Sequence, residues 1–363
     1  MTSNLFTPLR LGSLELPNRI VISPMCQYSA ENGRATAWHR QHWSSYALSC
    51  AGLMMVEATG VSPEGRITPA CLGLWDDETE EAMASALAFA RQFSDMPFGI
   101  QLGHAGRKAS TARPWDGGHV PPEKGGWRVL GPSPVPFAEG WQTPLELDEA
   151  GIQKVIDDFA AAARRAVRIG FDTIEIHGAH GYLLSSFLSP LANRRQDRWG
   201  GSLENRMRLP LAVFEAVKAA CPPSYPVGMR FNGTDWLEGG IVPDEAVALA
   251  RALHERGCAY VDVSSGGNAP AQIPVGPAYQ LPFASRIKRE VGIPVITVGM
   301  IRSPLHAEGI IATGEADAVA LGRVALNNPR WPWHAAEELG VELVVAPPYR
   351  FGATRQYRPT FGR

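Results

Sequence analysis

The stretches Val295–Gly299, VITVG, and Ala318–Gly322, AVALG, decide the fold together with six similar runs earlier in the chain. Both are continuously apolar apart from one threonine, both are short, and both end in glycine. Runs of this kind are typical of strands buried on both faces, as in a parallel sheet, whereas half-exposed strands alternate with polar residues. The six earlier runs are Ile20–Met25, Leu53–Ala58, Phe98–Leu102, Thr173–His177, Val227–Phe231 and Tyr260–Ser264.

Amphipathic helices are expected between several of these strands. The segment from Asp148 to Ile169 places apolar residues on one stripe, and Gly170 follows as the expected C-terminal stop. Residues 245–256, closed by Gly257, repeat this plan. Strands that alternate with helices predict a parallel sheet, and eight of them predict a closed (β/α)₈, or TIM, barrel. A doubly wound sheet is the structural rival, but no GxGxxG follows the first strand.

The sequence is expected to form a single α/β barrel domain over residues 1–363, with barrel strands from about residue 20 to about residue 322. Two segments, 103–147 and 178–205, are too long for plain connectors and are interpreted as functional loop insertions. Both follow strand C-termini, where barrel enzymes place their active sites. A C-terminal tail is expected at residues 346–363.

Composition excludes several classes of protein. The formal net charge of −2 gives no reason to expect a nucleic-acid partner. The N-terminus does not read as a signal peptide, and no stretch reaches the length of a membrane span. The five cysteines are scattered without a CxxC pair, which favours reduced thiols and a cytoplasmic location over a disulfide framework or an iron–sulfur cluster.

Polar residues and glycines at the ends of the predicted strands are the candidate site. Gly299 ends the seventh strand and Gly322–Arg323 ends the eighth, which is the usual phosphate position of barrels. Arg230 ends an otherwise apolar strand and needs an anionic partner. The amide of Gln101 can pair both a donor and an acceptor with an amide-like ring edge. A flat, uracil-like ring with a phosphate tail would satisfy these groups together.

Five segments of the chain resemble the Old Yellow Enzyme family of FMN-dependent ene-reductases. They are SPMCQY (Ser23–Tyr28), GIQLGHAGRKA (Gly99–Ala109), IEIHGAHGYLLSSFLSP (Ile174–Pro190), RRQDRWGGSLENR (Arg194–Arg206) and ALGRVALNNP (Ala320–Pro329). The resemblance runs from about Leu5 to the neighbourhood of Pro348. The cysteine and tyrosine of SPMCQY are similar to the bacterial xenobiotic-reductase, or thermophilic-like, branch.

The resemblance implies a role for each matching residue. His177 and His180 would donate hydrogen bonds to the substrate carbonyl oxygen, and Tyr182 would donate a proton to Cα after hydride leaves flavin N5. Cys26 would lie by the flavin and tune its potential, and Tyr28 would contact the bound ligand. The residues expected to line the cofactor are Ser23, Pro24, Met25, Cys26, Ala58, Gln101, Arg230, Ser265, Gly266, Gly299, Met300, Gly322 and Arg323.

The activity implied by this resemblance is ping-pong reduction of activated C=C bonds, in α,β-unsaturated carbonyl compounds and also in nitro compounds, by an NADPH-dehydrogenase-type flavoenzyme. FMN would be the cofactor, and NADPH or NADH the electron donor. A homodimer or homotetramer is expected, since a neighbour's C-terminal tail often completes the site in this branch. Arg350, Phe351, Tyr357 and Arg358 are the candidate residues of that tail.

Simpler roles remain open for several of these residues. His177 and His180 could be metal ligands with His104 as a third, but two histidines three apart make an incomplete site, so no metal is expected. Cys26 alone would more often be a small buried hydrophobe. Arg107 and Lys108 could be solvated charges or could bind the nucleotide phosphates.

Three functions therefore compete. The first is the ene-reductase. The second is a related barrel flavoenzyme that acts on dienoyl thioesters or amines, whose cysteine cluster and second domain are absent from this sequence. The third is a flavin-binding protein or a metal-dependent hydrolase without ene-reduction.

Overall fold

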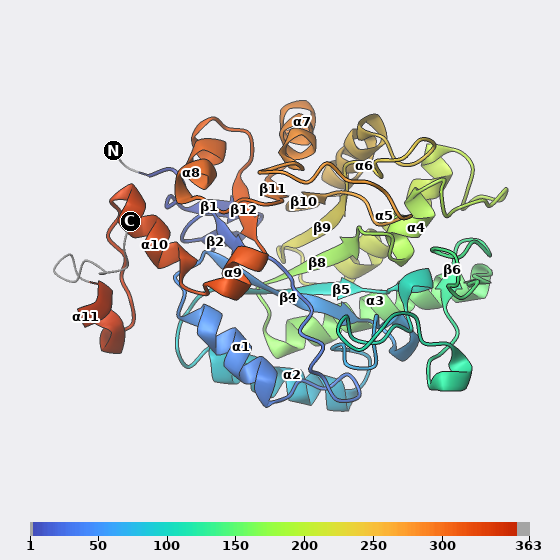
Figure 1. Cartoon of the computed structure of the whole chain (residues 1–363), viewed down its shortest axis with the longest axis horizontal. Coiled ribbons are helices and arrows are strands. Elements are labelled where there is room, and N and C mark those ends of the chain that lie inside the picture. Colours follow the sequence, from blue (N-terminus) through green and yellow to red (C-terminus); the bar gives the residue numbers. More distant parts are fainter. Residues whose placement is uncertain (1–2, 354–363) are drawn as a thin grey trace.

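The computed structural model describes residues 3–353, and within them eight parallel strands close into a barrel (Figure 1). The strands follow one another around the barrel in chain order, and the last pairs with the first, Ala320 opposite Val21. This confirms the predicted (β/α)₈ fold. The barrel strands are β3 (Ile20–Ile22), β4 (Leu53–Gly60), β5 (Phe98–Gly103), β8 (Thr173–Gly178), β9 (Val227–Asn232), β10 (Val261–Ser264), β11 (Val295–Val298) and β12 (Ala318–Leu321).

All eight predicted runs are strands, and their ends differ from the prediction by up to three residues. The largest difference is in β3, which ends at Ile22 instead of Met25. Ser23 still donates its N–H to Leu321 O, at 3.0 Å. Pro24 then has no N–H to donate, so it ends the pairing.

Helices surround the strands, as Figure 1 shows, and pack an apolar stripe against them. The predicted helix after Asp148 is α3 (Glu149–Ile169): Asp148 accepts from Gly151 N–H at its start, and Gly170 is left-handed at its end. The predicted helix at 245–256 is also confirmed, with Pro243 at its first position. That helix is α6 (Pro243–Glu255), and the other helices are α1 (Ala37–Ala47), α2 (Asp77–Ala90), α4 (Leu183–Leu188), α5 (Leu203–Ala220), α7 (Leu281–Val291), α8 (Pro304–Ala312), α9 (Arg323–Asn327), α10 (Trp331–Leu339) and α11 (Arg350–Ala353).

The long segments after β5 and β8 carry small elements of their own. The first contains the 3₁₀ turns η2 (Gly106–Lys108) and η3 (Pro122–Lys124) and the short strands β6 (Leu130–Gly131) and β7 (Leu145–Glu146). The second contains α4, which begins directly after Tyr182. None of the described helices is long and apolar enough to cross a bilayer.

An N-terminal hairpin, which sequence analysis did not anticipate, closes one end of the barrel. Strands β1 (Leu9–Leu11) and β2 (Leu14–Leu16) pair antiparallel around Gly12. Leu11 and Leu16 are fully buried and form one cluster with Met55, Tyr260 and Ile296 from the barrel strands. The hairpin therefore seals the end opposite the strand C-termini and leaves only the other end open for a site.

Replacing Leu16 with alanine should destabilise the protein by about 2–5 kcal/mol, since a fully buried leucine leaves a cavity that the rigid strands cannot fill. Urea unfolding measures this loss. Replacing its exposed neighbour Glu15 with alanine is the control and should change stability by less than about 0.5 kcal/mol. Equal losses in both variants would contradict the role of the hairpin as a plug.

Candidate active site

Charged side chains fill the middle of the barrel, above the apolar plug. Gln101 Nε2 donates to Glu175 Oε1 at 2.7 Å, and Arg230 Nε lies 3.4 Å from Asp262 Oδ2. All four residues are buried, and Arg230 and Asp262 are direct neighbours in the β9–β10 register. The anionic partner that Arg230 was expected to need is therefore supplied in part by the protein itself.

Two carboxyl groups share this interior with one guanidinium. Burial, followed by the nearby charge of Asp262, raises the pKa of Glu175 to about 8. Glu175 therefore holds a proton at neutral pH, which keeps the buried cluster close to neutral. Its hydrogen bond with Gln101 orients the amide that was expected to meet the cofactor ring.

His177 is the second-last residue of β8 and is a neutral hydrogen-bond donor. Its Nδ1 accepts from Ala179 N–H at 3.3 Å, so its proton is on Nε2. Burial, with the positive charges of Arg230 and Lys108, holds the pKa of His177 well below its usual value. The imidazole is therefore uncharged, and its Nε2–H remains for a ligand.

His180 lies beside His177, with ring centroids 5.2 Å apart. Its backbone is left-handed, at φ 60°, and its N–H donates to Asn232 Oδ1 at 3.1 Å. Its Nε2 lies 2.5 Å from Ser264 Oγ. Burial, followed by the charge of Arg230, also holds the pKa of His180 well below its usual value.

Tyr182 follows at the N-cap of α4, and its ring packs edge-on to His177 with centroids 4.9 Å apart. Burial, followed by repulsion from Cys26 and Tyr28, raises the pKa of Tyr182 well above its usual value. The phenol therefore keeps its proton at neutral pH. The three residues of the HGAHGY motif are thus brought together at the open end of the barrel.

Cys26 and Tyr28 approach this group from the segment after β3. A hydrogen bond with Cys71, followed by burial, raises the pKa of Cys26 well above its usual value, so Cys26 is a thiol. Tyr28 has a left-handed backbone, at φ 50°, and packs edge-on to Trp115 at 5.7 Å. Sequence analysis missed Cys71, whose position after η1 (Pro63–Gly65) gives no local signal.

The ends of β11 and β12 form the basic side of the site. Gly299 and Met300 both have positive φ, at 126° and 54°, and a Cβ on Gly299 would meet Tyr279 at 3.0 Å. Arg323 Nη2 donates to Met300 Sδ at 3.1 Å, and Arg302, which sequence analysis missed, donates to the same sulfur at 3.6 Å. Within residues 3–353, neither guanidinium has a carboxylate partner, so both are available to a phosphate.

The remaining residues expected at the cofactor also lie at this end. Met25 Sδ lies against Gly322, 3.8 Å from where a Cβ would be. Ser265 Oγ donates to Gln280 Oε1 at 2.7 Å, and Gly266 N–H donates to Thr234 O at 2.8 Å. Ala58 lies where the β4–β5 register shifts between Val56 and Thr59. Ser23 and Pro24 follow β3 directly.

These residues fit FMN. Arg230 Nε and Asp262 Oδ1 are buried and lack a hydrogen-bond partner, so polar atoms remain for a ring edge next to Gln101. Arg302 and Arg323 would hold the phosphate, and Met25 and Cys26 would border the ring.

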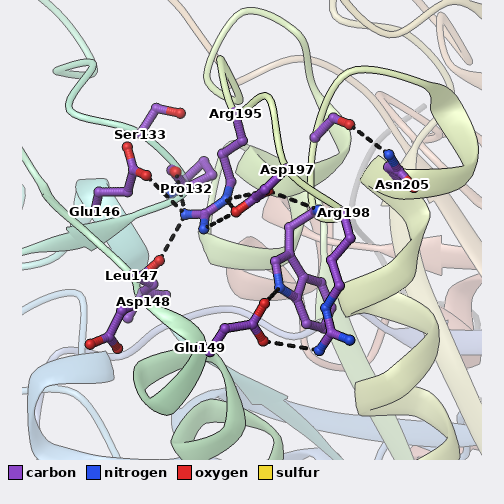
Figure 2. A network of polar contacts seen from close by, with 12 residues as sticks. Pro132, Ser133, Glu146, Leu147, Asp148, Glu149, Arg195, Asp197, Arg198 and Asn205 are labelled. Carbon is purple, nitrogen blue, oxygen red and sulfur yellow. Dashed lines mark hydrogen bonds and ion pairs between the residues drawn. The ribbon is translucent and has the colours of Figure 1, made fainter.

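The conspicuous motif RRQDRWGGS is structural (Figure 2). The buried guanidinium of Arg195 donates to Pro132 O at 3.0 Å and to Leu147 O at 2.7 Å, and it pairs with Asp197 at 2.6 Å. Trp199 Nε1 and Arg198 each donate to Glu149, at the start of α3. The motif therefore ties the loop after β8 to the loop after β5, and it contributes no group to the site.

The structure also bears on the metal alternative and on the C-terminal tail. In the part of the chain that the structure describes, no three His, Cys, Asp or Glu residues are placed to hold a metal ion. Arg350 and Phe351 belong to α11 and are exposed. Tyr357 and Arg358 lie outside the described residues.

Comparisons with known proteins agree with this geometry. Residues 4–342 match the NADH:flavin oxidoreductase / NADH oxidase family. The chain is 43% identical to NADPH dehydrogenase of Geobacillus thermodenitrificans over 97% of this chain and 99% of that one. Morphinone reductase, also solved in complex with tetrahydroNAD, has a TM-score of 0.78 and 30% identity over 95% of this chain and 91% of that one. An old yellow enzyme homologue from Zymomonas mobilis shares the fold, with a TM-score of 0.77 and 24% identity over 95% of this chain and 98% of that one.

These matches agree with the barrel and with the polar groups at its open end. The chain therefore belongs to the NADH:flavin oxidoreductase / NADH oxidase family and is an FMN-dependent oxidoreductase of the Old Yellow Enzyme type.

Proposed function

We propose that this flavoenzyme reduces the activated C=C bond of α,β-unsaturated carbonyl and nitro compounds. The observation that carries the proposal is the pairing of a neutral imidazole donor, His177, with a protonated phenol, Tyr182, 4.9 Å away between ring centroids. One group can bind a carbonyl oxygen while the other supplies a proton to the same substrate.

The histidines act on the oxygen of the substrate. A C=C bond accepts hydride readily when the developing negative charge moves onto an electronegative atom. Nε2–H of His177 would donate to that oxygen, and His180 would add a second contact by turning from Ser264. Donors of this kind, held in place before the reaction, stabilise the transition state by about 3 kcal/mol each.

Tyr182 would act on the α-carbon of the substrate. Because its pKa is raised, the phenol is protonated throughout the neutral range and can protonate Cα of the substrate. Bound FMN would supply the hydride chemistry between the nicotinamide nucleotide and Cβ of the substrate. Gln101, held by Glu175, and Arg230, held by Asp262, would orient the ring. NADPH is the favoured donor by similarity to the Geobacillus enzyme, although the morphinone reductase complex contains an NAD analogue.

The test is anaerobic. We expect the purified protein to be yellow, to bleach with NADPH, and to recover its colour when 2-cyclohexen-1-one is added. Bleaching without recovery would overturn the proposed substrate class and favour the related flavoenzymes or simple flavin binding. A colourless protein that does not take up FMN would overturn the cofactor assignment as well.

A further inference from the structure

Lys108 is a partly buried cation without an acidic partner. It belongs to η2, in the loop after β5, and in residues 3–353 no carboxylate lies within ion-pair distance of its ammonium group. Its neighbour Arg107 is also buried and donates to the carbonyls of Val135 and Asn268. Neither is a solvated charge, so the first of the two roles left open by the sequence does not apply. A cation that is partly withdrawn from water and has no counter-ion is costly, which makes Lys108 a functional candidate.

The ammonium group joins two loops of the site. Its Nζ donates to His180 O at 2.6 Å and to Gly267 O at 3.1 Å. These loops, after β8 and after β10, touch at their glycines: a Cβ on Gly181 would overlap Gly267 O, and a Cβ on Gly267 would lie 2.5 Å from His180 O. Both carbonyl oxygens accept from the same ammonium group, so Lys108 links the two loops where they touch.

The same ammonium group lies on the ring of Tyr182. Nζ is 5.2 Å from the Tyr182 ring centroid and 4.6 Å from that of Phe137. A cation at this range is attracted by a neutral ring and more strongly by a phenolate, whose charge spreads over the ring. Its effect is therefore greatest after Tyr182 has lost its proton.

We propose that Lys108 is a positioning residue for the proton-donating step: it holds the His180–Tyr182 loop against the Gly267 loop, and its charge favours the phenolate that remains on Tyr182. The inference rests on the proposed function. The phenol O–H bond breaks, the proton forms a C–H bond at Cα, and the phenolate is reprotonated from solvent after the product leaves.

The charge of Lys108 is sensitive to pH. Burial, followed by repulsion from Arg107, lowers the pKa of Lys108 to about 8. The titratable groups that face it are Arg107 from its own turn and His177, His180 and Tyr182 from the segment after β8. Both histidines are neutral and Tyr182 is protonated at this pH, so among these facing groups only Lys108 changes its charge near pH 8. The pKa of Glu175, deeper in the barrel, is also about 8, but its ionisation should affect the reactions of both test substrates alike.

The experiment compares wild type, Lys108→Met and Lys108→Arg over a pH series that brackets 8. The rate measured is anaerobic reoxidation of the NADPH-reduced holoenzyme by 2-cyclohexen-1-one and, separately, by a nitroalkene. The nitroalkene is the internal control because its reduced form leaves as a stabilised nitronate anion and needs no proton from Tyr182.

Relative to the nitroalkene rate, the wild-type enone rate should fall as pH rises through about 8, which gives an alkaline limb in the pH profile of this ratio. Lys108→Met should be about tenfold slower at neutral pH and should lack this alkaline limb, and Lys108→Arg should move the limb upward. The nitroalkene rate should change little in either variant. If Lys108→Met kept the fall near pH 8 with the enone but not with the nitroalkene, or lost rate equally with both substrates, the proposal would be overturned.

If Lys108→Met does not retain FMN, the pH profile of Lys108→Arg decides. A fall in the relative enone rate at the same pH as in wild type overturns the proposal, and a fall displaced to higher pH supports it. Failure of the proposed function is a separate outcome, because wild type itself would then not be reoxidised by the enone.

Discussion

Replacing Tyr182 with phenylalanine should slow enone-dependent reoxidation of the reduced enzyme by about 10²–10⁴-fold, the usual contribution of a general acid. Reduction by NADPH should be almost unchanged, since hydride transfer to the cofactor needs no proton from this residue. The structure makes the comparison direct, because the phenyl ring keeps the packing against His177 and removes only the hydroxyl. Anaerobic stopped-flow absorbance resolves the two half-reactions.

Tyr225→Phe is the matched control. Its hydroxyl donates to Phe171 O at 2.6 Å, just before β8 begins and at the opposite end of that strand from His177. We expect both half-reactions of this variant to keep wild-type rates, with only a small loss of stability. Equal rates in Tyr182→Phe and wild type would remove Tyr182 from the proton-donating role.

Replacing His177 with leucine should lower the rate of enone reduction by about 10²–10³-fold, because it removes a neutral N–H donor from the carbonyl oxygen while filling a similar volume. The loss should be constant across the neutral pH range, since burial keeps the pKa of His177 far below it. The measurement is the limiting rate of reoxidation at saturating enone.

His177→Asn is the informative companion, because asparagine offers an N–H donor of smaller reach. It should recover part of the rate that His177→Leu loses, and both variants should keep the visible spectrum of bound FMN. If the two variants were equally slow, the role of His177 would be packing against Tyr182, not hydrogen bonding to the substrate.

Much of the fold was predictable because it depends on local patterns. Runs such as Val295–Gly299 read as strands from their apolar residues alone, and Asp148 and Gly170 mark the two ends of α3 as cap residues. The N-terminal hairpin was missed because Leu9–Leu11 and Leu14–Leu16 are each three residues long, too short for a periodic signal. Their place under the barrel depends on contacts with Met55 and Tyr260, which are distant in sequence.

The candidate site likewise contains residues that the sequence indicated and residues that sequence analysis missed. His177, His180 and Tyr182 were predictable because they are adjacent in the chain and follow a strand end. Glu175 had a signal that was overlooked: with a period of two residues, it shares the inward face of β8 with His177. Asp262 has the same relation to Ser264 on β10.

The sequence by itself determined the barrel, its open catalytic end and the identity of the groups that can react, because periodicity, capping and strand-end position are local properties of the chain. Only the tertiary structure decided which charges are buried and with which partners they are paired. Arg230 with Asp262, Cys26 with Cys71, and Lys108 on the ring of Tyr182 each join segments that are far apart in the sequence. Burial and electrostatic attraction depend on distance in space, so a sequence can name such charges but cannot tell whether they are solvated, paired or held against a reacting group.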